Sequence, residues 1–166
     1  VVTVSTCSGF PYETSGDDPE KAFATLSRAL SIDPADERTQ GELERLAQAL
    51  GLFNELASLY AATVENVDNA DLQAAYHLKI ARIYEEQNQN VEKAIEHYRK
   101  VLAVDPLHVD AATALERAYQ TTENYEALAE IYLKKVEMIS DIDEQKQLLF
   151  KASQIYEEVF ENPEKA

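Results

Sequence analysis

The sequence repeats itself at an interval of 72 residues. The triplet Glu-Lys-Ala occurs at 20–22, 92–94 and 164–166, and the pair Asp-Pro occurs at 33–34 and 105–106. When residues 19–94 are aligned with residues 91–166 without a gap, 26 of the 76 positions are identical. Self-similarity at a fixed period indicates stacked supersecondary units, each too small to bury its apolar face alone.

The apolar residues within one period have helical spacing. Between 74 and 86 they recur at intervals of three and four residues, while most charged residues lie off that stripe. Turn-forming residues such as Asp33-Pro34, Gly51 and Asn162-Pro163 separate the stripes. The pattern predicts an all-α chain of about eight helices, near 19–32, 35–50, 52–67, 70–88, 91–104, 107–121, 124–139 and 142–161.

The charge of the chain excludes two classes of partner. Its 15 basic and 31 acidic residues give a net charge of −16, and both nucleic acid and anionic membranes require a cationic surface. A content of 45% hydrophobic residues is too high for a disordered acidic chain, and no apolar run is long enough for membrane insertion. We therefore expect a soluble folded protein. A single cysteine cannot form a disulfide within the chain, so it does not identify the cellular compartment of the protein; the cytoplasm is slightly favoured.

The stretch from about 74 to 107 resembles a tetratricopeptide repeat. Tyr84 stands where that family closes its inner helix, Ala94 and Tyr98 match the small and aromatic residues of the outer helix, and Pro106 matches the terminal proline. Ala81 occupies the position of a small residue at which two helices approach closely. The resemblance implies a right-handed α-solenoid of antiparallel helix pairs and, as function, protein–protein interaction in a concave groove.

The resemblance covers about residues 18–166. The units around 37–68 and 109–140 depart from the family pattern, since Leu56 and Leu128 replace the small alanine. We expect a repeat domain over 17–166 that stops inside the next repeat. Residues 1–16 lack a helical stripe, and we interpret them as an atypical leader, a linker, a degenerate cap or foreign sequence.

Few residues could carry catalysis or bind a metal. His77, His97 and His108 fall on three predicted helices without ligand spacing, and they are interpreted as solvated or half-buried. Cys7 lies in the leader without a catalytic partner, and the adjacent acidic pairs Glu85-Glu86 and Glu157-Glu158 are interpreted as solvent-facing. We predict no enzyme activity, no catalytic residue, no metal site and no cofactor.

One set of residues suggests a binding surface. In the resembled family, the residue two positions before the closing aromatic points into the groove. Arg45, Arg82 and Arg117 occupy that position in three units, and Gln154 occupies it in the last. Arg38, Asp110 and Gln120 are expected to flank them. Stacked guanidinium groups can bind the carboxylates of an acidic peptide or an acidic C-terminus through two hydrogen bonds each.

A simpler alternative remains open for each arginine. Arg45 has Glu42 and Glu44 nearby, Arg82 has Glu85 and Glu86, and Arg117 has Glu116, so each arginine could pair with a carboxylate of its own helix. Three functions are therefore weighed. The protein could be an adaptor or scaffold that binds a protein segment, a structural spacer that self-associates through its repeat ends, or an acidic chaperone for a basic protein.

Overall fold

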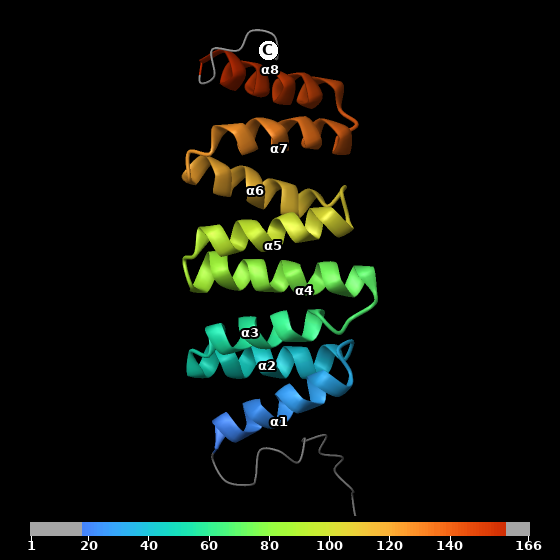
Figure 1. Ribbon diagram of the computed structural model, residues 1–166, viewed down its shortest axis with the longest axis vertical. Helices are drawn as coiled ribbons and strands as arrows, with labels where there is room; N and C mark the ends of the chain where they lie inside the picture. Colours follow the sequence, from blue (N-terminus) through green and yellow to red (C-terminus); the bar gives the residue numbers. More distant parts are fainter. Residues whose placement is uncertain (1–17, 159–166) are drawn as a thin grey trace, which may run out of the picture.

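The computed structural model describes residues 18–158, which form a single stack of helices. The elements are α1 (Pro19–Ile32), α2 (Glu37–Leu50), α3 (Phe53–Val64), α4 (Ala70–Arg82), a π-helical turn η1 (Ile83–Gln87), α5 (Val91–Val104), α6 (Val109–Thr121), α7 (Tyr125–Met138) and α8 (Ile142–Glu158). Figure 1 shows the helices following one another along the long axis in chain order, with α1 and α8 at opposite ends.

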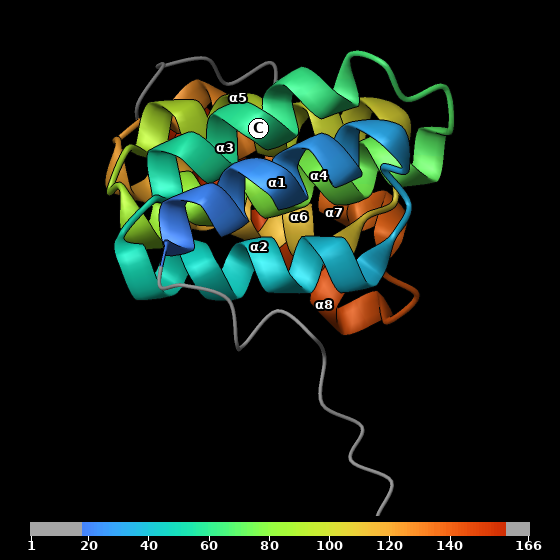
Figure 2. The ribbon, with the colours of Figure 1, turned by 90° about the horizontal axis from the view of Figure 1, so that it is seen from below.

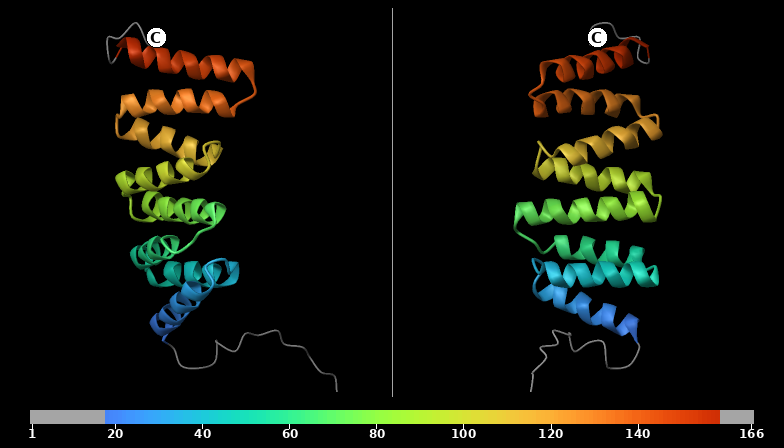
Figure 3. Two further views of the ribbon diagram at one scale, coloured as in Figure 1. Left: turned by 45° about the vertical axis from the view of Figure 1, so that its right-hand side comes forward. Right: turned by 180° about the vertical axis from the view of Figure 1, so that it is seen from behind.

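The packing follows the order of the chain. Each helix packs mainly against the helix before it and the helix after it, and the most extensive contacts join α4 to α5 and α7 to α8. The views in Figure 3 show neighbouring helices running in opposite directions, and Figure 2, viewed along the stack, places α1 in front of the later helices. Over residues 18–158 the fold is an all-helical α-solenoid, as the sequence predicts.

Two helices begin two residues later than predicted. The predicted helix 35–50 begins at Glu37, and the predicted helix 107–121 begins at Val109. In both turns an aspartate carboxylate accepts a hydrogen bond from the backbone amide two residues later in the chain. Asp33 accepts from the Ala35 amide and Asp105 accepts from the Leu107 amide, and each bond is 3.1 Å long. This local bond competes with the helix and delays its first turn.

Side chains also define where helices begin. The Asp36 carboxylate caps α2, and the His108 Nδ1 caps α6 by accepting from the Ala111 amide. His108 is therefore a capping residue, and its predicted place inside a helix is wrong. The third helix ends at Val64, three residues before the predicted Val67, which instead closes a turn through its amide and the Val64 carbonyl.

The predicted continuous helix 70–88 changes its hydrogen bonding near the end. From Ile83 to Gln87 the backbone forms a π-helical turn, in which the Asn88 amide donates to the carbonyl of Ile83, five residues earlier. The next contact, from the Asn90 amide to the Tyr84 carbonyl, spans six residues. The spacing between Tyr84 and Ala94 is one residue longer than usual for the resembled repeat, and the wider turn accommodates that residue.

The core consists of two adjoining groups of buried side chains. The first lies within α1–α4 and includes Leu43, Tyr60 and Tyr76; the second extends from α4 to α8 and includes Tyr98 and Leu115. Tyr84 packs against both groups, so the two cores are continuous through α4 and η1. No helix among the described residues is both long and apolar enough to cross a membrane.

The turns that join α2 to α3, α4 to α5 and α6 to α7 each contain a residue in the left-handed conformation. These residues are Gly51 (φ 71°), Gln89 (φ 48°) and Glu123 (φ 53°). Only glycine adopts this conformation without steric cost, and nothing lies within 4 Å of a Cβ built on Gly51. A substitution at Gly51 therefore changes stability through the backbone.

We expect Gly51→Ala to lower the free energy of unfolding by about 1 kcal/mol and Glu123→Gly to raise it by a similar amount. Gly41→Ala is the matched control, because Gly41 lies inside α2 with open space around it, and there alanine should stabilise by about 1 kcal/mol. Urea unfolding monitored by circular dichroism measures all three. A stabilising Gly51→Ala would contradict the assignment of this turn.

Candidate functional site

The three arginines singled out by the sequence lie on three different helices. Arg45 is on α2, Arg82 on α4 and Arg117 on α6, and their side chains are 65%, 53% and 66% exposed. We call these three residues the arginine row. Their exposure leaves the guanidinium groups accessible to a large ligand.

The structure pairs Arg82 and Arg117 with carboxylates of another helix or turn. The Arg82 Nη2 lies 4.0 Å from the Asp110 Oδ2 of α6, and the Arg117 Nη2 donates over 3.1 Å to the Glu85 Oε1 of η1. Only Arg45 pairs within its own helix, with the Glu42 Oε2 at 2.9 Å. The alternative of local pairing therefore describes Arg45, whereas the other two arginines link α6 to α4 and its π-helical turn.

Glu85 is not the solvent-facing residue that the sequence predicts. Its side chain is 28% exposed, and besides Arg117 it accepts a 2.5 Å hydrogen bond from the Tyr98 hydroxyl of α5. Burial, followed by this carboxylate, raises the pKa of Tyr98, which therefore remains a donor at physiological pH. Glu85 thus connects α5 and α6 at the π-helical turn, while its neighbour Glu86 is exposed.

The remaining predicted site residues are dispersed. Asp110 forms an ion pair with Arg82. Gln120 lies elsewhere: its Nε2 donates a 3.0 Å hydrogen bond to the Tyr132 hydroxyl of α7 and so links two helices. Arg38 is exposed near the beginning of α2, and Gln154 is exposed on α8. Among the predicted residues, the structure therefore brings Arg82 together with Asp110.

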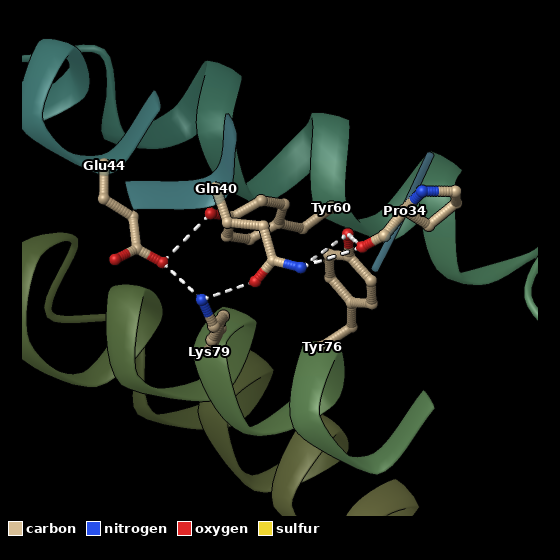
Figure 4. A network of polar contacts seen from close by, with 6 residues as sticks. All are labelled: Pro34, Gln40, Glu44, Tyr60, Tyr76 and Lys79. Carbon is tan, nitrogen blue, oxygen red and sulfur yellow. Dashed lines mark hydrogen bonds and ion pairs between the residues drawn. The ribbon is translucent and has the colours of Figure 1, made fainter. Parts of the chain in front are cut away.

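A polar network between α2, α3 and α4 was not predicted from the sequence (Figure 4). The carbonyl of Pro34 accepts from the Tyr76 hydroxyl at 2.6 Å and from the Gln40 Nε2 at 2.8 Å. At the other end, the Lys79 Nζ donates to the Gln40 Oε1 at 2.8 Å and to the Glu44 Oε1 at 2.7 Å. The network satisfies Gln40, which is only 6% exposed.

Two tyrosine hydroxyls have a fixed donor role in this network. The Tyr60 hydroxyl donates to the Glu44 Oε1 at 3.0 Å, and its ring meets the Tyr76 ring edge-on, with centroids 5.2 Å apart. Burial, followed by the charge of Glu44, raises the pKa of Tyr60, and burial raises the pKa of Tyr76 to about 12. Both hydroxyls therefore stay protonated at physiological pH. The sequence offered one sign of this network, namely the polar residue Gln40 on the inner side of α2.

The histidines His77 and His97 meet between α4 and α5. Their Nδ1 atoms are 3.2 Å apart, and the His97 ring stacks on Tyr84 with a centroid distance of 5.9 Å. His97 is 9% exposed, so its interpretation as a solvated or half-buried residue is wrong. Burial first, then the charges of Lys100 and His77, lower the pKa of His97 to about 4, and burial also lowers the pKa of His77. Nearby Glu96 acts in the opposite direction on both.

His97 should make stability depend on pH. Because its pKa is lower in the folded state than the ordinary 6.5, the unfolded chain binds its proton first as the pH falls. Its contribution to stability is complete above pH 6.5 and is lost progressively down to about pH 4. Between about pH 8 and about pH 5, we expect the wild type to lose about 1 to 2 kcal/mol relative to His97→Phe, which keeps the stack on Tyr84.

Comparing the wild type with His97→Phe cancels the contribution of the other titrating groups to the pH dependence of stability. Protonating carboxylates in a chain of charge −16 relieves repulsion in both proteins, so only the difference between their unfolding free energies reports His97. Parallel pH profiles of the two proteins would contradict the burial of a neutral imidazole.

The described part of the chain contains no cluster of potential metal ligands. Within residues 18–158, no three side chains of His, Cys, Asp or Glu gather closely enough to hold a metal ion. Cys7 and the predicted leader 1–16 lie outside the described residues, as does the repeated Glu-Lys-Ala triplet at 164–166. The polar contacts described above are exposed ion pairs and part-buried or buried hydrogen bonds between helices.

Comparisons with known proteins agree with the resemblance. Residues 74–106 match the model of the tetratricopeptide repeat family. Among solved structures, the crystal structure of BtubC (BKLC) from P. vanneervenii is similar, with 18% sequence identity and a TM-score of 0.52 over 83% of this chain and 63% of that chain. The chain thus spans less than two thirds of BtubC, and the likeness concerns the fold. No curated protein matches the chain.

The chain is therefore a helical repeat protein in which one stretch, residues 74–106, matches the tetratricopeptide repeat model. Repeats of this family generally mediate protein–protein interaction or scaffolding, and the family is typically non-enzymatic. The matched stretch includes most of α4, the turn η1 with Tyr84, and α5; α4 and α5 pack against each other extensively and contribute the histidine pair.

Proposed function

We propose that the protein is a non-enzymatic interaction module that binds an acidic segment of another protein along the arginine row. The observation that carries this proposal is the presence of an exposed arginine on each of the three successive even-numbered helices α2, α4 and α6. A segment crossing these helices would meet one guanidinium group at each.

The existing ion pairs are compatible with a second carboxylate. A guanidinium group has five N–H donors in a planar fork, and Arg117 contacts Glu85 through Nη2 alone. The ion pair between Arg82 and Asp110 is 4.0 Å long, and the Asp110 side chain is 73% exposed. Such an exposed pair contributes little to stability, so a carboxylate of a ligand can replace Asp110 at low cost. The internal carboxylates orient the two side chains while donors remain for a ligand.

A labelled oligo-glutamate peptide tests the proposal by fluorescence anisotropy. We expect the wild type to bind it with an affinity that weakens as salt is added, and the triple variant Arg45→Glu, Arg82→Glu, Arg117→Glu to bind at least about tenfold more weakly, because one charge-assisted hydrogen bond is worth about 1.5–3 kcal/mol. Circular dichroism must first show both proteins to be equally helical. A pull-down from lysate with the same pair then seeks the natural partner.

The matched control makes the same change of net charge on other helices. Arg28, Arg99 and Lys134 are exposed on α1, α5 and α7, and changing all three to glutamate also takes the net charge from −16 to −22. Equal losses in the two triple variants would mean that overall charge, and not the arginine row, governs binding. If the wild type binds only an oligo-lysine peptide, the function is that of an acidic chaperone and this proposal is wrong. If it binds neither peptide, the proposal is also wrong and the protein is a structural spacer.

A further inference from the structure

One side of α5 forms an open groove of about 400 Å³ in the middle of the stack. Six residues of this helix line the groove: Glu92, Ile95, Glu96, Arg99, Lys100 and Ala103. Ile95 is half-buried and packs against the core, whereas the other five residues are exposed. Both neighbours of α5, namely α4 and α6, are in place (Figure 1). This side of the helix is therefore exposed although the stack continues on both sides of it.

The six residues form one stripe, which we call the α5 stripe, and its charges are arranged symmetrically. They recur at intervals of three and four residues, as one face of a helix does. Positions 92 and 103, 95 and 100, and 96 and 99 are equally far from the midpoint between His97 and Tyr98. Glu96 therefore mirrors Arg99. A helix with this pattern is complementary in charge to an antiparallel copy of itself.

The α5 stripe is neutral although the chain is strongly acidic. Its two glutamates balance one arginine and one lysine, whereas the whole chain carries a net charge of −16. Most faces of two such molecules repel each other, because like charges meet. At the α5 stripe, opposite charges meet when two copies approach in antiparallel orientation. This face therefore favours a second copy of the chain as its partner.

The repeat itself does not require the charged pair at positions 96 and 99. The residues 72 positions earlier are Ala24 and Ser27, on α1. Both α1 and α5 are 14 residues long, and the residue equivalent to Ala94 of the core is also alanine, Ala22. Helix formation thus proceeds without Glu96 and Arg99 at this place in the repeat. The pair is specific to α5 and is available for a contact outside the stack.

The contact of Glu96 within its own helix leaves room for a second cation. The Lys100 Nζ lies 2.7 Å from the Glu96 Oε1, and the two side chains are 47% and 60% exposed. An exposed pair of this kind contributes little to stability. A carboxylate has two oxygens and accepts several hydrogen bonds, so Glu96 can keep Lys100 through Oε1 and accept from another molecule through Oε2.

From this self-complementary stripe we infer that the protein forms a two-fold dimer in which α5 packs antiparallel against α5 of a second copy. Glu96 of each molecule pairs with Arg99 of the other, and the symmetry makes this contact twice. The methylene groups of Lys100 cover Ile95 of the other copy. Because both molecules use the same surface, the contact closes on itself and stops at two molecules. The arginine row lies on other helices, so this inference does not depend on the proposed function.

The interface is small, and association should be weak. The α5 stripe extends over about 17 Å of helix, which covers less area than a standard protein interface. Added salt screens both the general repulsion of two acidic molecules and the pairs of the α5 stripe, which act in opposite directions. The test therefore keeps the ionic strength constant and changes the charges at the stripe.

Sedimentation equilibrium with protein from about 1 μM to about 1 mM covers weak association. The wild type should follow a monomer–dimer equilibrium without larger species. Glu96→Arg places two arginines opposite each other at both contacts, and Arg99→Glu places two glutamates there. Either change should raise the dissociation constant of the dimer at least about tenfold. Since the first takes the net charge from −16 to −14 and the second takes it from −16 to −18, overall charge cannot explain a loss in both.

Exchanging the charges should restore the dimer. The double variant Glu96→Arg, Arg99→Glu carries the same pair in reversed order and should dimerise about as tightly as the wild type. A mixture of the two single variants sets two arginines of one molecule against two glutamates of the other, so it should form a mixed dimer. Glu55→Arg on α3 and Arg28→Glu on α1, both exposed, are the matched controls and should dimerise like the wild type.

Circular dichroism should show all variants to be equally helical, because every substituted side chain is exposed. The inference is overturned if the wild type stays monomeric at every concentration, or if the two single variants of α5 dimerise like the wild type. It is also overturned if neither the double variant nor the mixture regains the dimer, because the antiparallel pairing of Glu96 with Arg99 requires both.

Discussion

Tyr76→Ala should lower the free energy of unfolding by about 3–5 kcal/mol, the range measured when a large buried aromatic side chain is truncated. Tyr76 is 1% exposed and packs edge-on against Tyr60. Its hydroxyl also donates to the Pro34 carbonyl, which belongs to the turn between α1 and α2. Removing the side chain leaves a cavity between α2, α3 and α4 and removes a link from that turn to α4.

The conservative variant separates these two contributions. Tyr76→Phe keeps the ring and removes the hydroxyl, and we expect it to cost about 1 kcal/mol because the Pro34 carbonyl retains its bond from Gln40. Urea unfolding of the wild type and of both variants gives the two differences. A loss below about 1 kcal/mol for Tyr76→Ala would mean that the first core contributes far less than its burial indicates.

Lys135→Met should be the second strongly destabilising change. The Lys135 Nζ of α7 lies 2.5 Å from the Glu116 Oε2 of α6, and the two side chains are only 13% and 16% exposed. Removing the lysine leaves a carboxylate largely shielded from water without its cation. Breaking a buried pair in this way costs about 3–5 kcal/mol, and the partial exposure of this pair reduces our expectation to about 2–3 kcal/mol.

The double variant Lys135→Met, Glu116→Leu is the control for the lysine change. Replacing both charges by apolar side chains removes the unpaired carboxylate, so most of the lost stability should return. Thermal or urea unfolding of the two single variants and the double variant completes the cycle. If the double variant is as unstable as the sum of the single variants, the ion pair has no coupling and the loss comes from packing alone.

The sequence was sufficient to identify the helices and their order. Apolar spacing and turn residues predicted eight helices, and the described residues contain them within a few positions. The errors occur where side chains compete with the backbone. Asp33 and Asp105 bind amides in their turns and shorten the following helices, and His108 caps α6. At Ile83–Gln87 an added residue converts α-helical to π-helical bonding. Periodicity alone does not reveal such local competition.

The sequence also selected the arginines of the proposed binding surface, but it misjudged their surroundings. Arg82 and Arg117 are exposed as expected, yet their carboxylate partners come from another helix or turn. Glu116, which sequence proximity suggested as a partner of Arg117, pairs instead with Lys135. Gln40 and Tyr76 form a buried network although 36 residues separate them. Pairs this distant in sequence leave no local signal.

The sequence by itself therefore determined the elements of this protein: helices, their antiparallel succession and the family of repeats that they resemble. These follow from local spacing, because each helix must bury its apolar stripe against its neighbours. The tertiary structure decided which polar side chain meets which, including the pairs His77–His97, Arg117–Glu85 and Lys79–Glu44. Such partners depend on how packed helices are positioned to within an ångström or two, because hydrogen bonds and ion pairs form only over a short range of distance and angle.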